Sequence, residues 1–391
     1  MRDPRWDHQI EERSWLYAGL AVDLGIDLVR LRAAYAGPPD STGDSAAWLA
    51  IGVLGRLARR GDEDAVLELR RYLRTGRDLD LALSELIPVA DHPAAQGLLD
   101  DVLDVADDDQ LRWSIGMDRH GRTSLPQWRG ADPRIDRAFA AGEAVRASWA
   151  REPAERQVSE RDLVLRAAAE SNLAAPASAA DLTEEQWEAT LLTIVTDDRR
   201  SVDHCWAPRS RRALRHAIEK SGSPAVLAWS RSMFTSRSRS DIDQEGYLEW
   251  LAFSMFTRVS ATASDGPRLN ELLVDAAARE HDGIGDQYEL VDALARLDHV
   301  AATTTIENLY DTTVYAWLRR RCAAALSRLS PDFADERAVE CLDDCESETR
   351  AIAIASVDPL VDDVRARLLR IADDPTEEDD NRRAAAARVL P

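Results

Sequence analysis

The chain contains 391 residues, of which 71 are acidic and 49 are basic, so its formal net charge at pH 7 is −22. Hydrophobic residues make up 45 % of the sequence, which excludes the composition of a disordered chain. The longest uncharged apolar stretches, such as Ala46–Gly55, contain about ten residues, whereas a membrane-spanning helix needs about twenty. The first residues also lack the apolar core of a secretory signal. We therefore expect a cytoplasmic protein that does not act in a membrane.

The N-terminal part of the chain carries an internal repeat. The phrase Leu54-Gly-Arg-Leu57 recurs 29 residues later as Leu83-Ser-Glu-Leu86, and stops such as Asp91-His-Pro93 separate short segments with helical spacing. Because a period of about 30 residues is typical of stacked helical hairpins, residues 1–112 are predicted to form helical repeats. Small residues in the phrases would let one helix lie close to its neighbour, and the aliphatic residues would line a buried stripe.

Residues 113–180 depart from this pattern. The stretch from Gly116 to Pro133 is rich in Gly, Pro and polar residues, which predicts a long loop. A charged helix is expected around Ile135–Ala150. It is followed by a connection at Leu173–Ala180 and by a new helix capped near Thr183. The sequence therefore predicts an irregular insertion between two sets of repeats.

Residues 181–391 carry the repeat again. Phe256-Thr-Arg-Val259, Leu294-Ala-Arg-Leu297 and Leu326-Ser-Arg-Leu329 resemble the N-terminal phrases. A second series begins with Arg and ends seven residues later with an aliphatic residue; it comprises Arg319–Leu326, Arg350–Val357 and Arg383–Leu390, with starts 31 and 33 residues apart. A lone helical hairpin cannot bury the apolar stripe that these aliphatic residues form, whereas stacked hairpins bury it continuously.

Two of these segments, Glu348–Ala355 and Asn381–Ala387, resemble the second helix of HEAT repeats. Each has a polar turn, then Arg, then an Ala-rich helix. The resemblance is clearest over residues 284–391 and extends to 45–112 and 180–260. It implies an all-α, armadillo-type fold, namely a right-handed α-α superhelix, or solenoid, of stacked HEAT-like hairpins. Because HEAT repeats serve many functions, it implies an architecture and no particular activity.

A basic segment interrupts the acidic chain. Between Arg199 and Arg239 there are ten basic and two acidic residues, so this window carries +8 and the rest of the chain −30. Guanidinium groups bind carboxylates and phosphates, and nearby aromatic rings can stack on a partner. The candidate partner-binding residues are Arg209, Arg211, Arg212, Arg215, Arg231, Arg237, Arg239, Trp206 and Trp229. In the alternative, which we favour slightly, these arginines pair with acidic residues of neighbouring repeats, such as Asp197 and Asp241.

The predicted loop is a second candidate site. Long loops often carry function, and Arg119, His120, Arg122 and Trp128 would supply charge and a stacking ring. In the alternative, the insertion only covers one end of the repeats. The sequence places no acid–base partner beside His120, so no catalytic role is predicted for it.

The chain has no recognisable catalytic, cofactor or metal motif. Its cysteines form no CxxC pair, and its acidic runs lack the ligand pattern of a calcium loop. We expect the acidic runs at 100–109 and 373–380 to be solvated turns that precede helices. Buried, reduced thiols are expected at Cys205, Cys322, Cys341 and Cys345.

The eleven tryptophans fall into two groups. Core positions are predicted for Trp15, Trp48, Trp187, Trp250 and Trp317, which lie on apolar stripes. Positions beside the loop or the basic segment are predicted for Trp113, Trp128, Trp206 and Trp229.

These observations favour a non-enzymatic scaffold or adaptor that binds another macromolecule, in the first place a protein, on the surface of its repeats. The alternative is a nucleic-acid-binding protein, because one family of bacterial DNA glycosylases is built from HEAT-like repeats. No catalytic motif of those enzymes is present, and a net charge of −22 repels phosphates. HEAT-repeat bilin lyases are a third class, but the sequence identifies no chromophore pocket.

Overall fold

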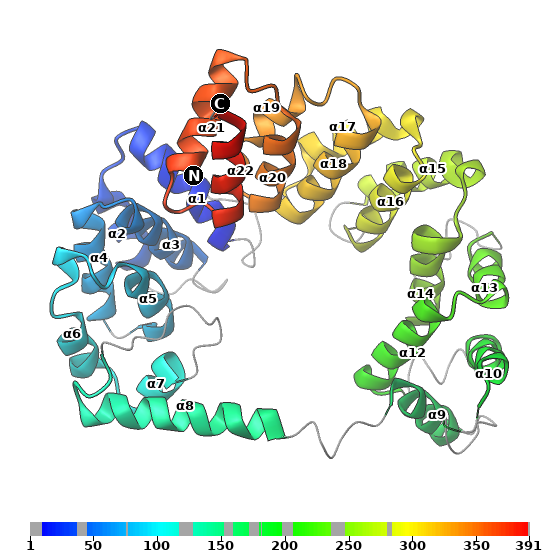
Figure 1. The fold of residues 1–391 in the computed structure, drawn as a ribbon, viewed down its shortest axis with the longest axis horizontal. Coiled ribbons are helices and arrows are strands. Elements are labelled where there is room, and N and C mark those ends of the chain that lie inside the picture. The colour runs from blue at the N-terminus through cyan, green and yellow to red at the C-terminus, as the bar shows by residue number, and fades with distance from the viewer. Residues whose placement is uncertain are drawn as a thin grey trace. The chain divides into compact units, whose positions relative to one another are not determined.

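The computed structural model describes residues 10–36, 45–75, 77–116, 128–151, 159–171, 180, 182–197, 206–235, 247–279 and 284–389. Every regular element in these ranges is helical, with no strand among them, which confirms the prediction of an all-α chain (Figure 1). The chain divides into two compact units: unit 1 combines Met1–Pro153 with Tyr310–Pro391, and unit 2 is the intervening Ala154–Leu309.

Unit 1 is built from helices at both ends of the chain. The N-terminal elements are α1 (Ile10–Asp23), α2 (Leu28–Ala36), α3 (Ser45–Arg59), α4 (Glu63–Leu73), α5 (Leu79–Leu86), η2 (Ile87–Val89), η3 (Pro93–Ala95), α6 (Leu98–Val105), α7 (Asp108–Leu111), η4 (Arg112–Gly116) and α8 (Pro133–Arg151). The C-terminal elements are α18 (Ala316–Leu329), α19 (Arg337–Cys341), α20 (Ser347–Ser356), α21 (Asp362–Asp373) and α22 (Asp379–Val389).

Unit 2 is formed by one continuous stretch of chain. Its elements are α9 (Glu160–Glu170), α10 (Glu184–Asp197), α12 (Pro208–Ser221), α13 (Pro224–Thr235), α14 (Tyr247–Met255), η8 (Phe256–Ser260), η9 (Ala263–Asp265), α15 (Gly266–Ala277), α16 (Ile284–Arg296) and η11 (Val300–Ala302). Helix α17 (Thr303–Thr312) crosses the boundary between the units.

Acidic side chains cap the N-termini of several helices. The Asp62 carboxylate accepts a hydrogen bond from the Ala65 N–H at the start of α4, and at α7 Asp107 and Gln110 cap each other's backbone. Such caps satisfy N–H groups that have no partner within the helix, and negative charge is favourable at this end of the helix dipole. The prediction of solvated turns before helices is confirmed for Asp107 but is wrong for Asp101, which is buried within α6, and for Glu377 in the run at 373–380, which is buried as well.

The repeated aliphatic phrases lie in the cores of the two units. The leucines that end the phrases at 54–57, 83–86 and 326–329 are all buried. Two phrases end differently: Leu297 is half-buried, and Val259 has 48 % of its surface exposed. Val259 lies in the π-helical turn η8, whose wider turn moves it off the stripe that an α-helix would form.

Successive hairpins contact one another through alternate helices. Helix α2 contacts α4 and α4 contacts α6, while α3 contacts α5. Near the C-terminus α18 contacts α20 and α20 contacts α22. This two-layer order is compatible with stacked helical hairpins.

Arginine–carboxylate pairs bridge one repeat to the next. The pairs are Arg32 with Glu68, Arg70 with Asp101, Arg231 with Asp265, Arg258 with Glu289, Arg319 with Asp344 and Arg350 with Glu377. The partners lie 25 to 36 residues apart, which is about one repeat period. We call these six pairs the arginine series. It includes Arg319 and Arg350, the first residues of two predicted repeat phrases.

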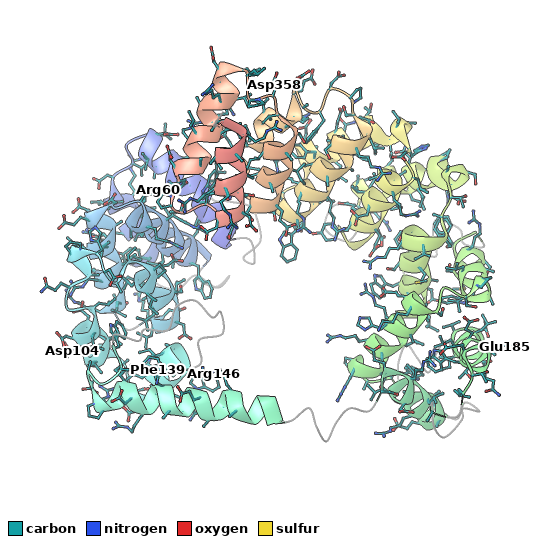
Figure 2. The ribbon with its side chains drawn as sticks, viewed as in Figure 1. Arg60, Asp104, Phe139, Arg146, Glu185 and Asp358 are labelled. Atoms are coloured by element: carbon teal, nitrogen blue, oxygen red, sulfur yellow. The ribbon has the colours of Figure 1, made fainter. Side chains whose placement is uncertain are left out.

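Helices from the two ends of the chain are in direct contact within unit 1. Arg60, which follows α3 and is labelled in Figure 2, binds Asp374, which follows α21, with 2.6 Å between Nη2 and Oδ2. Arg56 donates a hydrogen bond of 2.5 Å to the Thr376 carbonyl. The sequence repeat predicted helices at both ends but not this contact, because a period carries no information about which distant repeats meet.

The burial of the tryptophans corrects part of the predicted assignment. Trp187 is buried as predicted, but Trp48 and Trp317 are 45 % and 44 % exposed. Both lie in the first turn of a helix, α3 and α18, before the helix enters the core. Conversely, the predicted surface candidates Trp128, Trp206 and Trp229 are buried.

The segment between the two predicted sets of repeats is helical where it is described. Helix α8 confirms the charged helix expected around 135–150. Thr183 and Gln186 cap the start of α10 reciprocally, with bonds of 2.9 and 3.2 Å. Residues 117–127 of the predicted loop lie outside the described residues. The division into 1–112, 113–180 and 181–391 remains a prediction; the chain passes from unit 1 to unit 2 within the middle segment.

Candidate functional site

Helix α12 carries all of the described basic residues of the basic segment except Arg231, which lies in α13. Pro208 occupies the first turn, where no backbone donor is needed, and Gly222 ends the helix with a φ of +57°, which glycine adopts without strain. One face of the helix is buried through Ala213, Leu214, Ala217 and Ile218. This apolar face fixes which basic residues point outward.

The exposed side of α12 is a row of four basic residues. Arg209, Arg212, His216 and Lys220 follow one another at spacings of three and four, so they share one helix face, and all four are exposed. We call them the α12 row. Arg209 and Arg212 make no ion pair with any residue that the structure describes. Among the described residues, the row therefore presents two guanidinium groups without an ion-pair partner, in a strongly acidic chain.

The far end of the α12 row contacts α9. Glu160 lies 2.9 Å from Nδ1 of His216 and 3.4 Å from Nζ of Lys220. The hydrogen bond with His216 holds the pKa of Glu160 below its ordinary value. Glu160 was not predicted as part of the site, because it is 56 residues from His216 in sequence.

Arg211 and Arg215 are directed against α14 instead. Their guanidinium groups lie 5.6 Å from the ring centre of Tyr247 and 5.0 Å from that of Trp250. Arg215 also pairs with Glu219 at 2.7 Å. Burial raises the pKa of Tyr247 to about 12, so this phenol stays neutral and donates a hydrogen bond to the Arg211 carbonyl. These two arginines thus fasten α12 to α14.

Three further predicted residues make contacts within unit 2. Arg231 binds both carboxylate oxygens of Asp265, at 2.8 and 2.6 Å, and belongs to the arginine series. Trp206 is buried and donates to Ser171 Oγ at 3.0 Å, and Trp229 is buried as well. Internal pairing therefore accounts for part of the basic segment, and neither tryptophan can stack on a partner at the surface.

The remaining sequence candidates are not brought to this site. Arg237 and Arg239 lie outside the described residues, as do Arg119, His120 and Arg122 of the predicted loop. Trp128 is buried in the core of unit 1, so it is not an exposed stacking ring.

No metal site is found within the described part of the chain, where no three His, Cys, Asp or Glu side chains gather. Cys322, Cys341 and Cys345 are buried free thiols, as predicted, and Cys205 lies outside the described residues. Burial raises the pKa of Cys341 to about 11, and its Sγ lies 3.0 Å from the Tyr310 hydroxyl. Within the described ranges, no helix is both long and apolar enough to span a membrane.

Comparison of the chain with family models, with curated proteins and with solved structures found no match. The functional argument therefore rests on the geometry of the described residues.

Proposed function

We propose that the chain is a cytoplasmic HEAT-type solenoid adaptor without enzymatic activity, and that it binds an acidic segment of another protein along the α12 row. The observation that carries this proposal is the α12 row itself. Its four exposed positions are all basic, although the chain as a whole carries −22. Complementary charge guides association and fixes the register of a partner.

The architecture supports the same proposal. Alternate helices in contact and an arginine series at one-repeat spacing are typical of stacked repeats, which use extended surfaces for binding. Residues 209–220 span three turns of α12, so an extended or helical acidic segment can follow the row, with its main contacts at Arg209 and Arg212, because His216 and Lys220 already contact Glu160.

A protein partner is favoured over a nucleic acid for two reasons. The negative charge of the chain repels a polyanionic backbone beyond the α12 row. The aromatic rings nearest the row, Tyr247 and Trp250, already carry Arg211 and Arg215 against them, and bases need an accessible ring on which to stack.

The test measures fluorescence anisotropy with a labelled glutamate-rich peptide of about 12 residues, over a salt series. We expect binding that weakens with salt and falls at least about tenfold in the Arg209→Glu/Arg212→Glu variant, because two attractive contacts become repulsive.

The matched control is Arg382→Glu/Arg383→Glu on α22, which changes the net charge of the chain equally but lies in unit 1. Equal losses in both double variants would mean that net charge, and no particular site, governs binding. Tighter binding of a single-stranded oligonucleotide of similar charge would favour the nucleic-acid function instead.

A further inference from the structure

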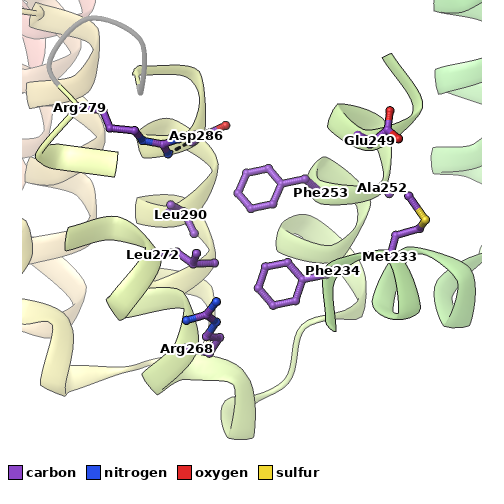
Figure 3. Close-up of a pocket in the computed structure, with 10 residues that line it drawn as sticks. All are labelled: Met233, Phe234, Glu249, Ala252, Phe253, Arg268, Leu272, Arg279, Asp286 and Leu290. Carbon is purple, nitrogen blue, oxygen red and sulfur yellow. Dashed lines mark hydrogen bonds and ion pairs between the residues drawn. The ribbon is translucent and has the colours of Figure 1, made fainter. Parts of the chain in front are cut away.

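Unit 2 contains a pocket that the proposed adaptor function does not use. Its walls come from α13 and α14 on one side and from α15 and α16 on the other (Figure 3). Its volume is about 580 Å³, which includes the solvent space at its mouth. Like many sites for small ligands, the pocket has a mainly apolar lining with a few polar groups.

The middle of the pocket is apolar and has two different walls. Phe234 and Phe253 form one wall, with ring centres 6.4 Å apart, and both rings point toward Leu272 and Leu290 on the other wall (Figure 3). Phe234 is held in place by a stacked contact of 4.0 Å with Phe256. A flat ring or a hydrocarbon chain can therefore lie between the aromatic and the aliphatic wall.

One end of the pocket carries an available positive charge. The Arg268 side chain reaches the lower end of the pocket in Figure 3 and is 48 % exposed. Its ion pair is with Glu271, three residues on in the same helix, and the Glu271 side chain is 65 % exposed. Such a pair contributes little in water, so the guanidinium can exchange it for a ligand anion.

The other charges of the lining are placed differently. Asp286 is paired with Arg279 at 3.1 Å at the opposite end of the pocket. Glu249 lies across α14 from the ring of Phe253, away from Arg268 (Figure 3). Arg268 is thus the charged group that meets a ligand lying between the two walls.

We propose that this pocket binds an anionic amphiphile, with its apolar ring or chain between the phenylalanines and leucines and its carboxylate or sulfonate on Arg268. Binding is non-covalent and does not depend on the α12 row.

The test compares two fluorescent probes with the same aromatic body. Anilinonaphthalene sulfonate carries an anionic group, and phenylnaphthylamine lacks it. We expect one molecule of the sulfonate to bind per chain. Arg268→Gln should weaken the sulfonate about tenfold, because it removes a charged hydrogen bond, and leave the uncharged probe unchanged. Ala252→Leu, which adds carbon atoms to the lining, and Phe253→Ala, which removes a ring, should weaken both probes.

Arg383→Gln on α22 is the matched control, because Arg383 is also exposed and pairs with an acidic residue three positions away in its own helix, and it should leave both probes unchanged. Thermal unfolding by circular dichroism identifies any variant that does not fold. Wild-type binding by Arg268→Gln, an equal loss of both probes in that variant, or wild-type binding by both Ala252→Leu and Phe253→Ala overturns the proposal.

Competition experiments then distinguish the two kinds of anionic amphiphile, an aromatic acid and a fatty acyl chain. Displacement of the sulfonate by naphthoate indicates an aromatic acid, and displacement by decanoate indicates an acyl chain. Displacement by neither overturns the proposal.

Discussion

Arg350 makes four hydrogen bonds inside unit 1. Its guanidinium binds both Glu377 oxygens, at 2.5 and 2.8 Å, and the carbonyls of Asp344 and Cys345. It also lies 3.9 Å from the ring centre of Trp15 in α1. One residue therefore joins the final repeats to each other and to the first helix.

Removing the carboxylate partner of Arg350 should be strongly destabilising. Glu377→Ala leaves a buried guanidinium without its counter-charge, which typically costs about 3–5 kcal/mol. Urea unfolding followed by circular dichroism measures the loss. The control is Asp380→Ala, which removes the exposed partner of Arg383 and should change stability by less than about 1 kcal/mol. Similar losses in the two variants would contradict this assignment.

At the scale of single residues, the sequence predicted where the structural arginines lie better than it predicted which carboxylates they pair with. Arg319 and Arg350 stood out as the first residues of repeat phrases, but Asp344 and Glu377 come from the following repeat and carry no local signal. In the basic segment, the outward direction of Arg209 could have been predicted from the apolar stripe of α12. The pairing of Arg231 with Asp265 depends on tertiary structure and could not.

At the scale of secondary-structure elements, a small residue lies where two helices contact one another. Gly55, in the first predicted phrase, lies in α3 where an added Cβ would collide with the Glu85 side chain of α5. That carboxylate is paired with Arg59. The space above Gly55 is thus occupied by the carboxylate of this ion pair, while the close approach of helices at small residues stays a prediction.

Gly55→Ala should therefore destabilise unit 1 by about 1 kcal/mol net, since displacing Glu85 from its part-buried pair with Arg59 costs more than the gain of about 1 kcal/mol that alanine brings to a helix. Gly19→Ala in α1 is the control. A Cβ there meets nothing within 4 Å, and alanine favours a helix by about 1 kcal/mol, so this variant should be more stable than wild type. Thermal melts of the two variants should shift in opposite directions. A shift of both in the same direction would show that the collision is relieved without cost.

Helical periodicity predicted elements well and their ends poorly. It identified α8, the Thr183 cap and the buried stripes, because these depend on residues within a few turns. It misplaced Trp48 and Val259, because exposure in a first turn and a π-helical turn both depend on the surrounding chain. The pocket between α13 and α16 had no sequence signal, since its walls come from separate hairpins.

For the whole molecule, the acidic excess has a structural use. Carboxylates cap helices and supply one side of the arginine series, so their charge is partly neutralised where it is built into the fold. At Asp374, burial acts to raise the pKa, but the hydrogen bonds from Arg60 and Thr376 outweigh it and hold the pKa below its ordinary value. This carboxylate therefore contributes stability in its ionised form.

The contact between the two ends of the chain should for this reason weaken in acid. Asp374 is ionised at neutral pH, and its contribution is lost as the pH falls below about 4 through the depressed pKa. Asp374→Asn should cost about 1–3 kcal/mol at pH 7, because Arg60 loses its counter-charge. The difference in urea midpoint between wild type and variant should shrink steadily as the pH falls. Acidification also reduces the charge repulsion within a chain whose net charge is −22. This reduction affects both proteins alike, so comparing them at each pH cancels it. A difference that stays constant down to low pH would mean that the Asp374 carboxylate contributes by its shape and hydrogen bonds rather than by its charge.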